Sequence, residues 1–378
     1  MLDHWIADRM SMIEASGIRK IFELAAGMKN PINLSIGQPH FEVPKPIKEA
    51  AKAAIDRGDN GYTVTQGIPT LRQKLAAEIG LRLPGQQREV VVTSGTSGAL
   101  MVALCATVNP GDEVILFDPY FVAYPHLVTL AGGKSVVLDT YPDFRIDVQK
   151  VREAITPRTK AILFSSPSNP TGVTTDADTL RNLANLAREK GVLLIADEIY
   201  RSFWYEGQFR SAAEFDPNVL VLDGFGKSYG ITGWRIGYAH GPKRLIDEMA
   251  KLQQFTFVCT PSIVQHAGVA ALDCDISTIV ADYRRKRDFV YEALGEFFEI
   301  ARPGGAFYVY PKAPWGTATE FVQEAIRHNL LIIPGSAFSR KDSHFRVSYA
   351  ASDETLQSGI DVLQALARRK MNEKTFSG

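Results

Sequence analysis

Residues 219–239 read VLVLDGFGKSYGITGWRIGYA, and a glycine-rich turn in this stretch joins two apolar runs. The runs Val221–Leu222 and Ile236–Ala239 predict two strands. The turn between them carries Lys227 and Arg235. Glycines beside the lysine allow another molecule to approach the backbone closely. We therefore predict that the chain is organised around this turn.

The lysine and the arginine of this turn suggest a ligand. Removal from water lowers the pKa of a lysine, and a neutral amine forms Schiff bases with carbonyl compounds. The planar fork of Arg235 suits a phosphate. Together Lys227 and Arg235 favour a carbonyl cofactor with a phosphate group, and pyridoxal phosphate is the leading candidate. On these residues alone, a surface turn with solvated charges remains an alternative.

The turn also resembles a family motif. Gly226-Lys227, followed by Thr232-Gly-Trp-Arg-Ile-Gly237, is similar to the cofactor-lysine motif of class I and II aminotransferases, which are pyridoxal-phosphate enzymes of fold type I. The family usually has Ser-x-Ser-Lys, whereas this chain has Gly224 and Gly226. This departure removes a hydroxyl expected on the cofactor phosphate.

The resemblance implies an α/β fold with two domains. A large cofactor-binding domain over residues 41–270 would hold a mostly parallel sheet flanked by helices. A smaller α+β domain would come from both chain ends, residues 1–40 and 271–378, and include an amphipathic N-terminal arm over residues 3–28. The length of 378 residues favours two or three domains. Strand–helix alternation over residues 89–200 predicts parallel βαβ units with sites at the strand ends.

The composition limits which partners and which cellular compartment we expect for the protein. Lys+Arg and Asp+Glu both number 42, so nothing favours nucleic acid or an anionic membrane as a partner. The basic run 284–287 lies in a helical pattern and is predicted to be a solvated face. Three scattered cysteines favour buried thiols in a reducing compartment. The start has no apolar signal core, and no run is long enough to cross a bilayer. We predict a cytoplasmic protein without a metal site.

A second segment predicts an anion site. The strand 89–92 leads into Thr93-Ser-Gly-Thr-Ser-Gly98, and a helix begins near Ala99. Backbone N–H groups at a helix start bind anions together with the helix dipole. Gly95, Thr96 and Ser97 are the candidates for the cofactor phosphate. An ordinary N-cap loop is the alternative, but Arg235 elsewhere in the chain favours the phosphate.

Candidate ring contacts follow three predicted strands. After the strand 112–117, the resemblance implies that Phe121, or else Tyr120, stacks on the cofactor ring. After the strand 161–164, it implies that Asn169 of Asn-Pro-Thr-Gly bonds the ring hydroxyl oxygen. The apolar run 192–196 predicts a central strand that ends in Asp197. A buried carboxylate needs a partner, and a protonated pyridine nitrogen, a salt bridge or a helix N-cap would each serve. Tyr200 is predicted to face the ring from its oxygen side.

The remaining candidates rest on the resemblance. It implies that the backbone N–H of Gly37 lies near the substrate carboxylate, and that Arg346 holds this carboxylate by a bidentate fork. Without it, Arg346 would be a solvated arginine on an edge strand. It also implies that Tyr62 reaches across a homodimer to the partner's cofactor phosphate, so that the active sites are shared.

The expected function is a pyridoxal-phosphate-dependent aminotransferase with a ping-pong mechanism between an L-amino acid and a 2-oxo acid. Lys227 would act as general base, with Asp197 and Tyr200 beside it. A β-eliminating lyase of the same fold is an alternative, as is a non-catalytic pyridoxal-phosphate-binding protein. Ser97 stands where some aspartate-specific relatives carry a lysine, so acidic substrates gain no support there. Phe121, Tyr124, Phe307 and Tyr308 suit apolar or aromatic substrates, or equally simple packing.

Overall fold

The computed structural model describes residues 3–14, 17 and 27–375. The predicted N-terminal arm over residues 3–28 falls partly outside the described residues. Its described part holds two short 3-10 helices, Asp3–Trp5 and Asp8–Met12. Over the part of the chain that is described, no helix is long and apolar enough to cross a membrane.

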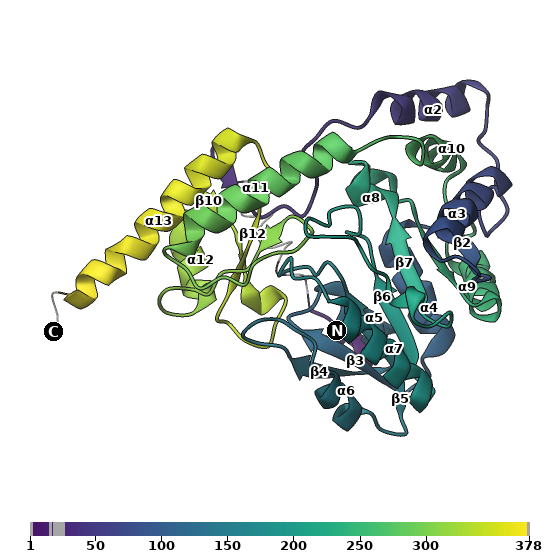
Figure 1. The fold of residues 1–378 in the computed structure, drawn as a ribbon, viewed down its shortest axis with the longest axis horizontal. Helices are drawn as coiled ribbons and strands as arrows, with labels where there is room; N and C mark the ends of the chain where they lie inside the picture. Colours follow the sequence, from purple (N-terminus) through teal and green to yellow (C-terminus); the bar gives the residue numbers. More distant parts are fainter. Residues whose placement is uncertain (1–2, 15–16, 18–26, 376–378) are drawn as a thin grey trace.

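The centre of the molecule is a seven-stranded sheet with the order β2-β8-β7-β6-β5-β3-β4 (Figure 1). All neighbours pair in parallel except β8, which is antiparallel to both β2 and β7. The strands are β2 (Glu89–Thr93), β3 (Glu113–Asp118), β4 (Lys134–Asp139), β5 (Thr159–Ser165), β6 (Leu193–Asp197), β7 (Leu220–Gly224) and β8 (Gly237–Gly241).

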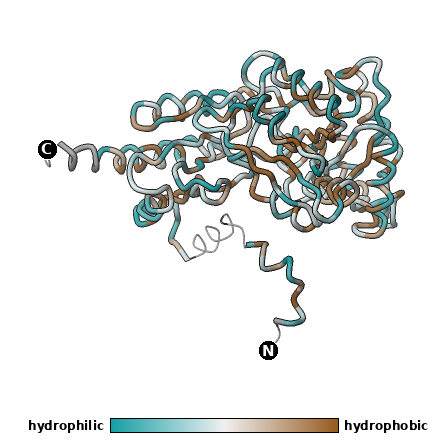
Figure 2. Tube along the Cα trace, turned by 90° about the horizontal axis from the view of Figure 1, so that it is seen from below, coloured by the Kyte–Doolittle hydropathy of each residue, from teal (hydrophilic) through white to brown (hydrophobic). Residues whose placement is uncertain are grey.

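Helices cover both faces of this sheet. Successive side chains of a strand point to opposite faces, and in β5 Ile162 and Phe164 belong to one apolar core whereas Ala161 and Leu163 belong to another. Burial on both faces explains the continuous apolar runs in the sequence, which form the hydrophobic interior in Figure 2. The first core includes α3 (Pro69–Arg82), α7 (Ala177–Lys190) and α10 (Ser262–Ala271); the second includes α4 (Gly95–Thr107), α5 (Ala123–Leu130) and α9 (Lys243–Thr256).

A smaller α+β part forms a third core. Strand β1 near the start of the chain pairs with β10, so both ends of the chain meet here. In Figure 1 the long helices α11 and α13 lie side by side. The elements are β1 (Ile32–Asn33), β9 (Tyr308–Val309), β10 (Leu330–Leu331), β11 (Ile333–Pro334), β12 (Phe345–Ser348), α11 (Ser277–Gly295), α12 (Ala318–Arg327) and α13 (Asp353–Thr375). The predicted α/β fold with a smaller α+β part is confirmed, whereas the boundaries at residues 41 and 270 stay a prediction.

The expectation of a solvated basic face at residues 284–287 is wrong for two of its members. Lys286 is 3% exposed and Arg287 is 1% exposed. Lys286 Nζ donates to the carbonyl of Ala351 at 2.7 Å, and Arg287 Nη1 donates to the carbonyl of Pro303. Helix α11 therefore turns these two cations inward, because acceptors from other segments meet them there.

Candidate active site

The carboxyl ends of the parallel strands border a cavity of about 320 Å³. All but one of the predicted site residues line it: Gly37, Gly95, Thr96, Ser97, Phe121, Asn169, Asp197, Tyr200, Lys227, Arg235 and Arg346. Such clefts at strand ends are the usual ligand sites of parallel α/β sheets. The exception is Tyr62, whose side chain is 88% exposed and lies outside this lining.

Lys227 lies in α8 (Phe225–Ser228), a single helical turn directly after β7. Its Nζ donates to the carbonyl of Gly37 and lies 5.9 Å from the centre of the Tyr200 ring. The pKa of Lys227 is lowered to about 8, chiefly by burial and also by the nearby cations Arg346 and Arg235, while Asp197 opposes the lowering. A larger share of this amine is therefore neutral near pH 7 than of a solvated lysine, as a nucleophile or base requires.

Asp197 ends the central strand β6 and is 4% exposed. Tyr124 donates its hydroxyl hydrogen to Oδ2 at 2.8 Å, and the backbone N–H of Ile199 donates to Oδ1 at 3.2 Å. Burial raises the pKa of Asp197 to about 6, although these two hydrogen bonds act against the rise. Its carboxylate has no ion pair within the described chain, so a cationic ring nitrogen in the cavity would supply the missing charge.

Two glycines bring Arg235 against the first turn of α4. A Cβ atom on Gly95, which has φ +66°, would lie 2.7 Å from Arg235 Nη2. A Cβ atom on Gly237 would lie 2.7 Å from the backbone N of Thr96. Arg235 itself has a left-handed backbone, and its Nη1 donates to the carbonyl of Thr232 at 3.0 Å. A guanidinium and a helix N-terminus thus converge at one end of the cavity, which suits a phosphate.

A hydroxyl from α4 lies next to the glycine at position 224. A Cβ atom on Gly224 would lie 3.0 Å from Thr96 Oγ1 and 3.1 Å from Ile199 Cδ1. The Thr96 hydroxyl donates to the carbonyl of Asp223 at 3.3 Å. A hydroxyl therefore borders the space in which a serine at position 224 would lie. The residues present fit a phosphate-bearing cofactor despite the missing Ser-x-Ser.

Arg346 lies on β12, the middle strand of the sheet β11-β12-β9, and is 1% exposed. The alternative of a solvated edge-strand arginine is therefore wrong. Its Nη1 donates to Asn169 Oδ1 at 2.9 Å, and its Nη2 donates to the carbonyl of Ser35 at 2.7 Å. Its buried Nε has no hydrogen-bond partner within the described residues. The guanidinium is thus fixed in direction and retains capacity to bind an anion in the cavity.

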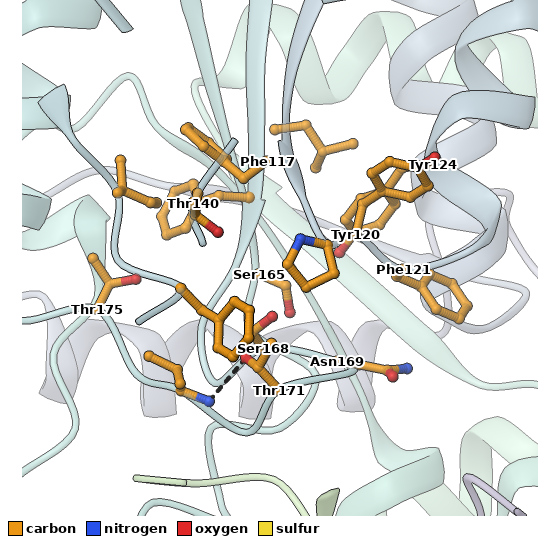
Figure 3. A pocket seen from close by; sticks show the side chains of 16 residues that line it. Phe117, Tyr120, Phe121, Tyr124, Thr140, Ser165, Ser168, Asn169, Thr171 and Thr175 are labelled. Carbon is orange, nitrogen blue, oxygen red and sulfur yellow. Dashed lines mark hydrogen bonds between the residues drawn. The ribbon is translucent and has the colours of Figure 1, made fainter. Parts of the chain in front are cut away.

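Aromatic residues frame the ring-binding end of the site. Phe121 lines the main cavity, whereas Tyr120 lines only a smaller neighbouring one, which favours Phe121 as the stacking residue. Figure 3 shows this neighbouring group of residues, with Phe121 and Asn169 on the same side. Both side chains thus reach the boundary between the two cavities.

Sequence reasoning missed the roles of Tyr124 and Tyr308. Tyr124 is the hydrogen-bond donor to Asp197, and the Tyr308 hydroxyl lies 2.9 Å from that of Tyr200. The Tyr308 ring also lies 4.6 Å from the guanidinium carbon of Arg346. From the sequence, both are aromatic residues that suit a substrate or simple packing. A buried tyrosine needs a polar partner, and this was the signal that could have placed them.

The chain is similar to proteins of known family over nearly its whole length. The model of the family "Aminotransferase class I and II" matches residues 29–363. A probable aspartate aminotransferase of Methanocaldococcus jannaschii is 35% identical over 96% of this chain and 99% of its own. Aromatic-amino-acid aminotransferase 2 of Thermococcus litoralis is 32% identical over 97% of this chain and 99% of its own.

A solved structure agrees with these relatives. The aspartate aminotransferase of Thermus thermophilus with maleate superposes with a TM-score of 0.90 at 34% identity, over 96% of this chain and 99% of that one. The partly buried lysine, the carboxylate at the end of the central strand and the guanidinium beside a helix N-terminus are consistent with the same family. The chain therefore belongs to the class I and II aminotransferases, enzymes that move amino groups with pyridoxal 5'-phosphate as cofactor.

Proposed function

We propose that Lys227 is the catalytic residue of this aminotransferase, and that donor and acceptor react in turn in the cavity around it. The observation that carries the proposal is a partly buried amine with a lowered pKa that shares one cavity with Asp197, Arg235 and Arg346. Each of these three charges suits a different chemical group: Asp197 suits a ring nitrogen, Arg235 a phosphate and Arg346 a substrate carboxylate.

Pyridoxal phosphate, when bound, supplies an aldehyde carbon that bonds to amines and a ring that accepts electrons. The N-terminus of α4 and Arg235 would hold its phosphate, with hydrogen bonds from Gly95, Thr96 and Ser97. Phe121 would cover one face of the ring, and Asp197 would keep the ring nitrogen protonated. Asn169 and Tyr200 would donate to the ring hydroxyl oxygen, with Tyr308 keeping Tyr200 in place.

The substrate is oriented by its carboxylate. Arg346 offers a fixed guanidinium for this group, and the loop at Gly37 lies next to it in the cavity wall. With the cofactor bound, Lys227 would act as the general base and acid that moves the proton of the α-carbon. The burial that lowers the pKa of Lys227 to about 8 keeps part of the amine ready as a base at neutral pH.

We also propose that the enzyme is a homodimer with shared sites, in which Tyr62 reaches the partner's cofactor phosphate. Tyr62 and Val64 of one loop are 88% and 53% exposed, and Phe255 of α9 is 80% exposed. The side chain of Gln253 donates to the carbonyl of Thr65, which joins this loop to the end of α9. Exposed aromatic and aliphatic groups next to each other support an interface. The unpaired cysteines support a cytoplasmic location.

The replacement Lys227→Ala tests the catalytic proposal. We expect this variant to lose steady turnover of any amino acid with any 2-oxo acid. The matched control is Lys243→Ala, because Lys243 is an exposed lysine at the start of α9 that pairs with Asp247. Retained turnover in Lys227→Ala, or equal loss in both variants, rules out Lys227 as the catalytic residue.

A further inference from the structure

The loop of residues 35–41 directs two of the cations at the proposed substrate site. The carbonyl of Ser35 accepts a hydrogen bond from Arg346 Nη2 at 2.7 Å. The carbonyl of Gly37, which lines the cavity, accepts one from Lys227 Nζ. A shift of this loop would therefore move the acceptors of both cations, so the contacts that fix the loop also fix the groups that meet the substrate.

The far end of this loop is attached to α11 through His40. The backbone N–H of His40 donates to the Tyr283 hydroxyl oxygen at 3.2 Å, and His40 Nδ1 lies 2.9 Å from the same oxygen. His40 Nε2 lies 2.7 Å from Lys286 Nζ. The ring of Phe41, the next residue, packs edge-on against Tyr283 with the ring centres 6.0 Å apart. One imidazole therefore joins the loop to two side chains of α11.

The partners of Lys286 determine which nitrogen of His40 carries a proton. An ammonium group has three N–H donors and no acceptor. The acceptors around Lys286 Nζ are the carbonyl of Ala351 at 2.7 Å, Asp282 Oδ2 at 3.2 Å and His40 Nε2 at 2.7 Å. Nε2 therefore accepts and carries no proton, whereas Nδ1 carries the proton and donates it to Tyr283. The observed contacts thus require the neutral form of His40.

A second proton on His40 would break this arrangement. It would place an imidazolium 2.7 Å from the Lys286 ammonium, with two donors facing each other. Asp282 of α11 and Asp353 of α13 offset part of this repulsion, but both also pair with Arg285. Burial and the charge of Lys286 lower the pKa of His40 from its ordinary value of 6.5, while the two carboxylates act against this. The link is therefore intact at neutral pH and is lost in acid.

We infer that His40 is a positioning residue, which in its neutral form holds the loop 35–41 on α11 and releases it on protonation. The inference rests on the proposed roles of Arg346 and Gly37 in binding the substrate carboxylate. Since the loop serves this carboxylate, its release should mainly weaken substrate binding. We therefore expect the KM for the amino donor to rise in acid more than kcat falls.

Steady-state kinetics of the cofactor-loaded enzyme from pH 5 to 8 test the inference. The donor is whichever of leucine, phenylalanine and aspartate reacts fastest. We expect the native KM to rise by up to about 10-fold toward pH 5, the order given by the repulsion of two partly solvated cations. His40→Gln keeps a neutral acceptor of similar reach, so it should keep the native KM at pH 8 and lose the rise in acid. His40→Ala should have a raised KM at every pH.

The control is His4→Gln, because His4 is an exposed histidine of the first 3-10 helix. This variant should keep the native pH profile. Protonation of Asp197 also affects the enzyme in acid, but it does so equally in the native protein and in His40→Gln, so the comparison of the two isolates His40. An acid rise of KM that persists in His40→Gln, or a native KM at pH 8 in His40→Ala, overturns the inference.

Hydrogen exchange of the apoprotein gives a readout that does not depend on activity. After correction for the intrinsic pH dependence of exchange, the amides of residues 35–41 should be about 10-fold less protected at pH 5 than at pH 8. In His40→Gln the protection should be equal at both pH values, and an unchanged pH dependence overturns the inference. If no amino acid reacts with the loaded enzyme, the proposed function fails, and hydrogen exchange still decides the role of His40.

Discussion

Replacement of Arg346 by lysine tests the carboxylate site. Arg346 uses Nη1 on Asn169 and Nη2 on Ser35, at 2.9 and 2.7 Å. A lysine keeps the charge but cannot make these two bonds and hold a carboxylate in a fork as well. The loss of one charge-assisted hydrogen bond costs about 2 kcal/mol, which is roughly 30-fold in rate. We therefore expect kcat/KM for a good amino acid donor to fall by at least this factor.

The assay compares an amino acid with the amine that lacks its carboxylate, such as leucine and 3-methylbutylamine. The contact exists only for the amino acid, so Arg346→Lys should reduce kcat/KM for leucine and leave the slow reaction of the amine nearly unchanged. Arg302→Lys is the control, since Arg302 is an exposed arginine paired with Glu206. An equal loss for leucine and the amine would refute the reasoning, because it would point to general damage of the site.

Three further predictions follow from buried or shared groups. Tyr124→Phe removes a hydrogen bond that lowers the pKa of Asp197. As the pH is lowered, the variant apoprotein should therefore stop taking up pyridoxal phosphate at a higher pH than the native one. An unchanged pH dependence of cofactor uptake contradicts this. Burial raises the pKa of Glu198 in the folded protein to about 7. The protonated carboxyl therefore stabilises the fold, and this contribution is fully present below the pKa of the unfolded chain and is lost as the pH rises through the pKa of the folded protein. Glu198→Gln should therefore gain in free energy of unfolding relative to the native protein as the pH rises from 5 to 8, by on the order of 3 kcal/mol at most. Thermal denaturation across this range measures the gain, and a difference that does not change with pH would speak against it. If Tyr62 serves the partner's site, Tyr62→Ala and Lys227→Ala should regain activity when unfolded and refolded together, whereas a mixture no more active than its parts excludes sharing.

The sequence predicted the parts of the site that lie in short local motifs. Lys227 and Arg235 share one turn, and Asp197 ends an apolar run, so their chemistry could be recognised without the fold. The neighbours that orient them come from distant segments. Tyr124 meets Asp197 across 73 positions, and Ser35 meets Arg346 across 311. A single sequence carries no record of such register between elements, which is why these contacts were not predicted.

Errors in the secondary elements have similar causes. The apolar residues within 304–310 favour a strand, but only Tyr308–Val309 form one. Ala306 has φ +55°, and a Cβ atom on Gly305 would lie 2.4 Å from Pro167 Cγ. Close packing against another loop thus overrides an apolar pattern that favours a strand. The same holds for the basic run in α11, because a pattern of charges does not show which of them will meet buried carbonyl acceptors in the folded protein.

The most direct test of the account is a mass measurement on the protein purified with its cofactor. Treatment with borohydride fixes a reducible bond between an amine and an aldehyde, and proteolysis then locates the modified lysine. The account predicts one pyridoxyl-phosphate adduct, on the peptide that contains Lys227, and its loss in Lys227→Ala. An adduct on another lysine, or none on a yellow and active protein, would contradict the central claim.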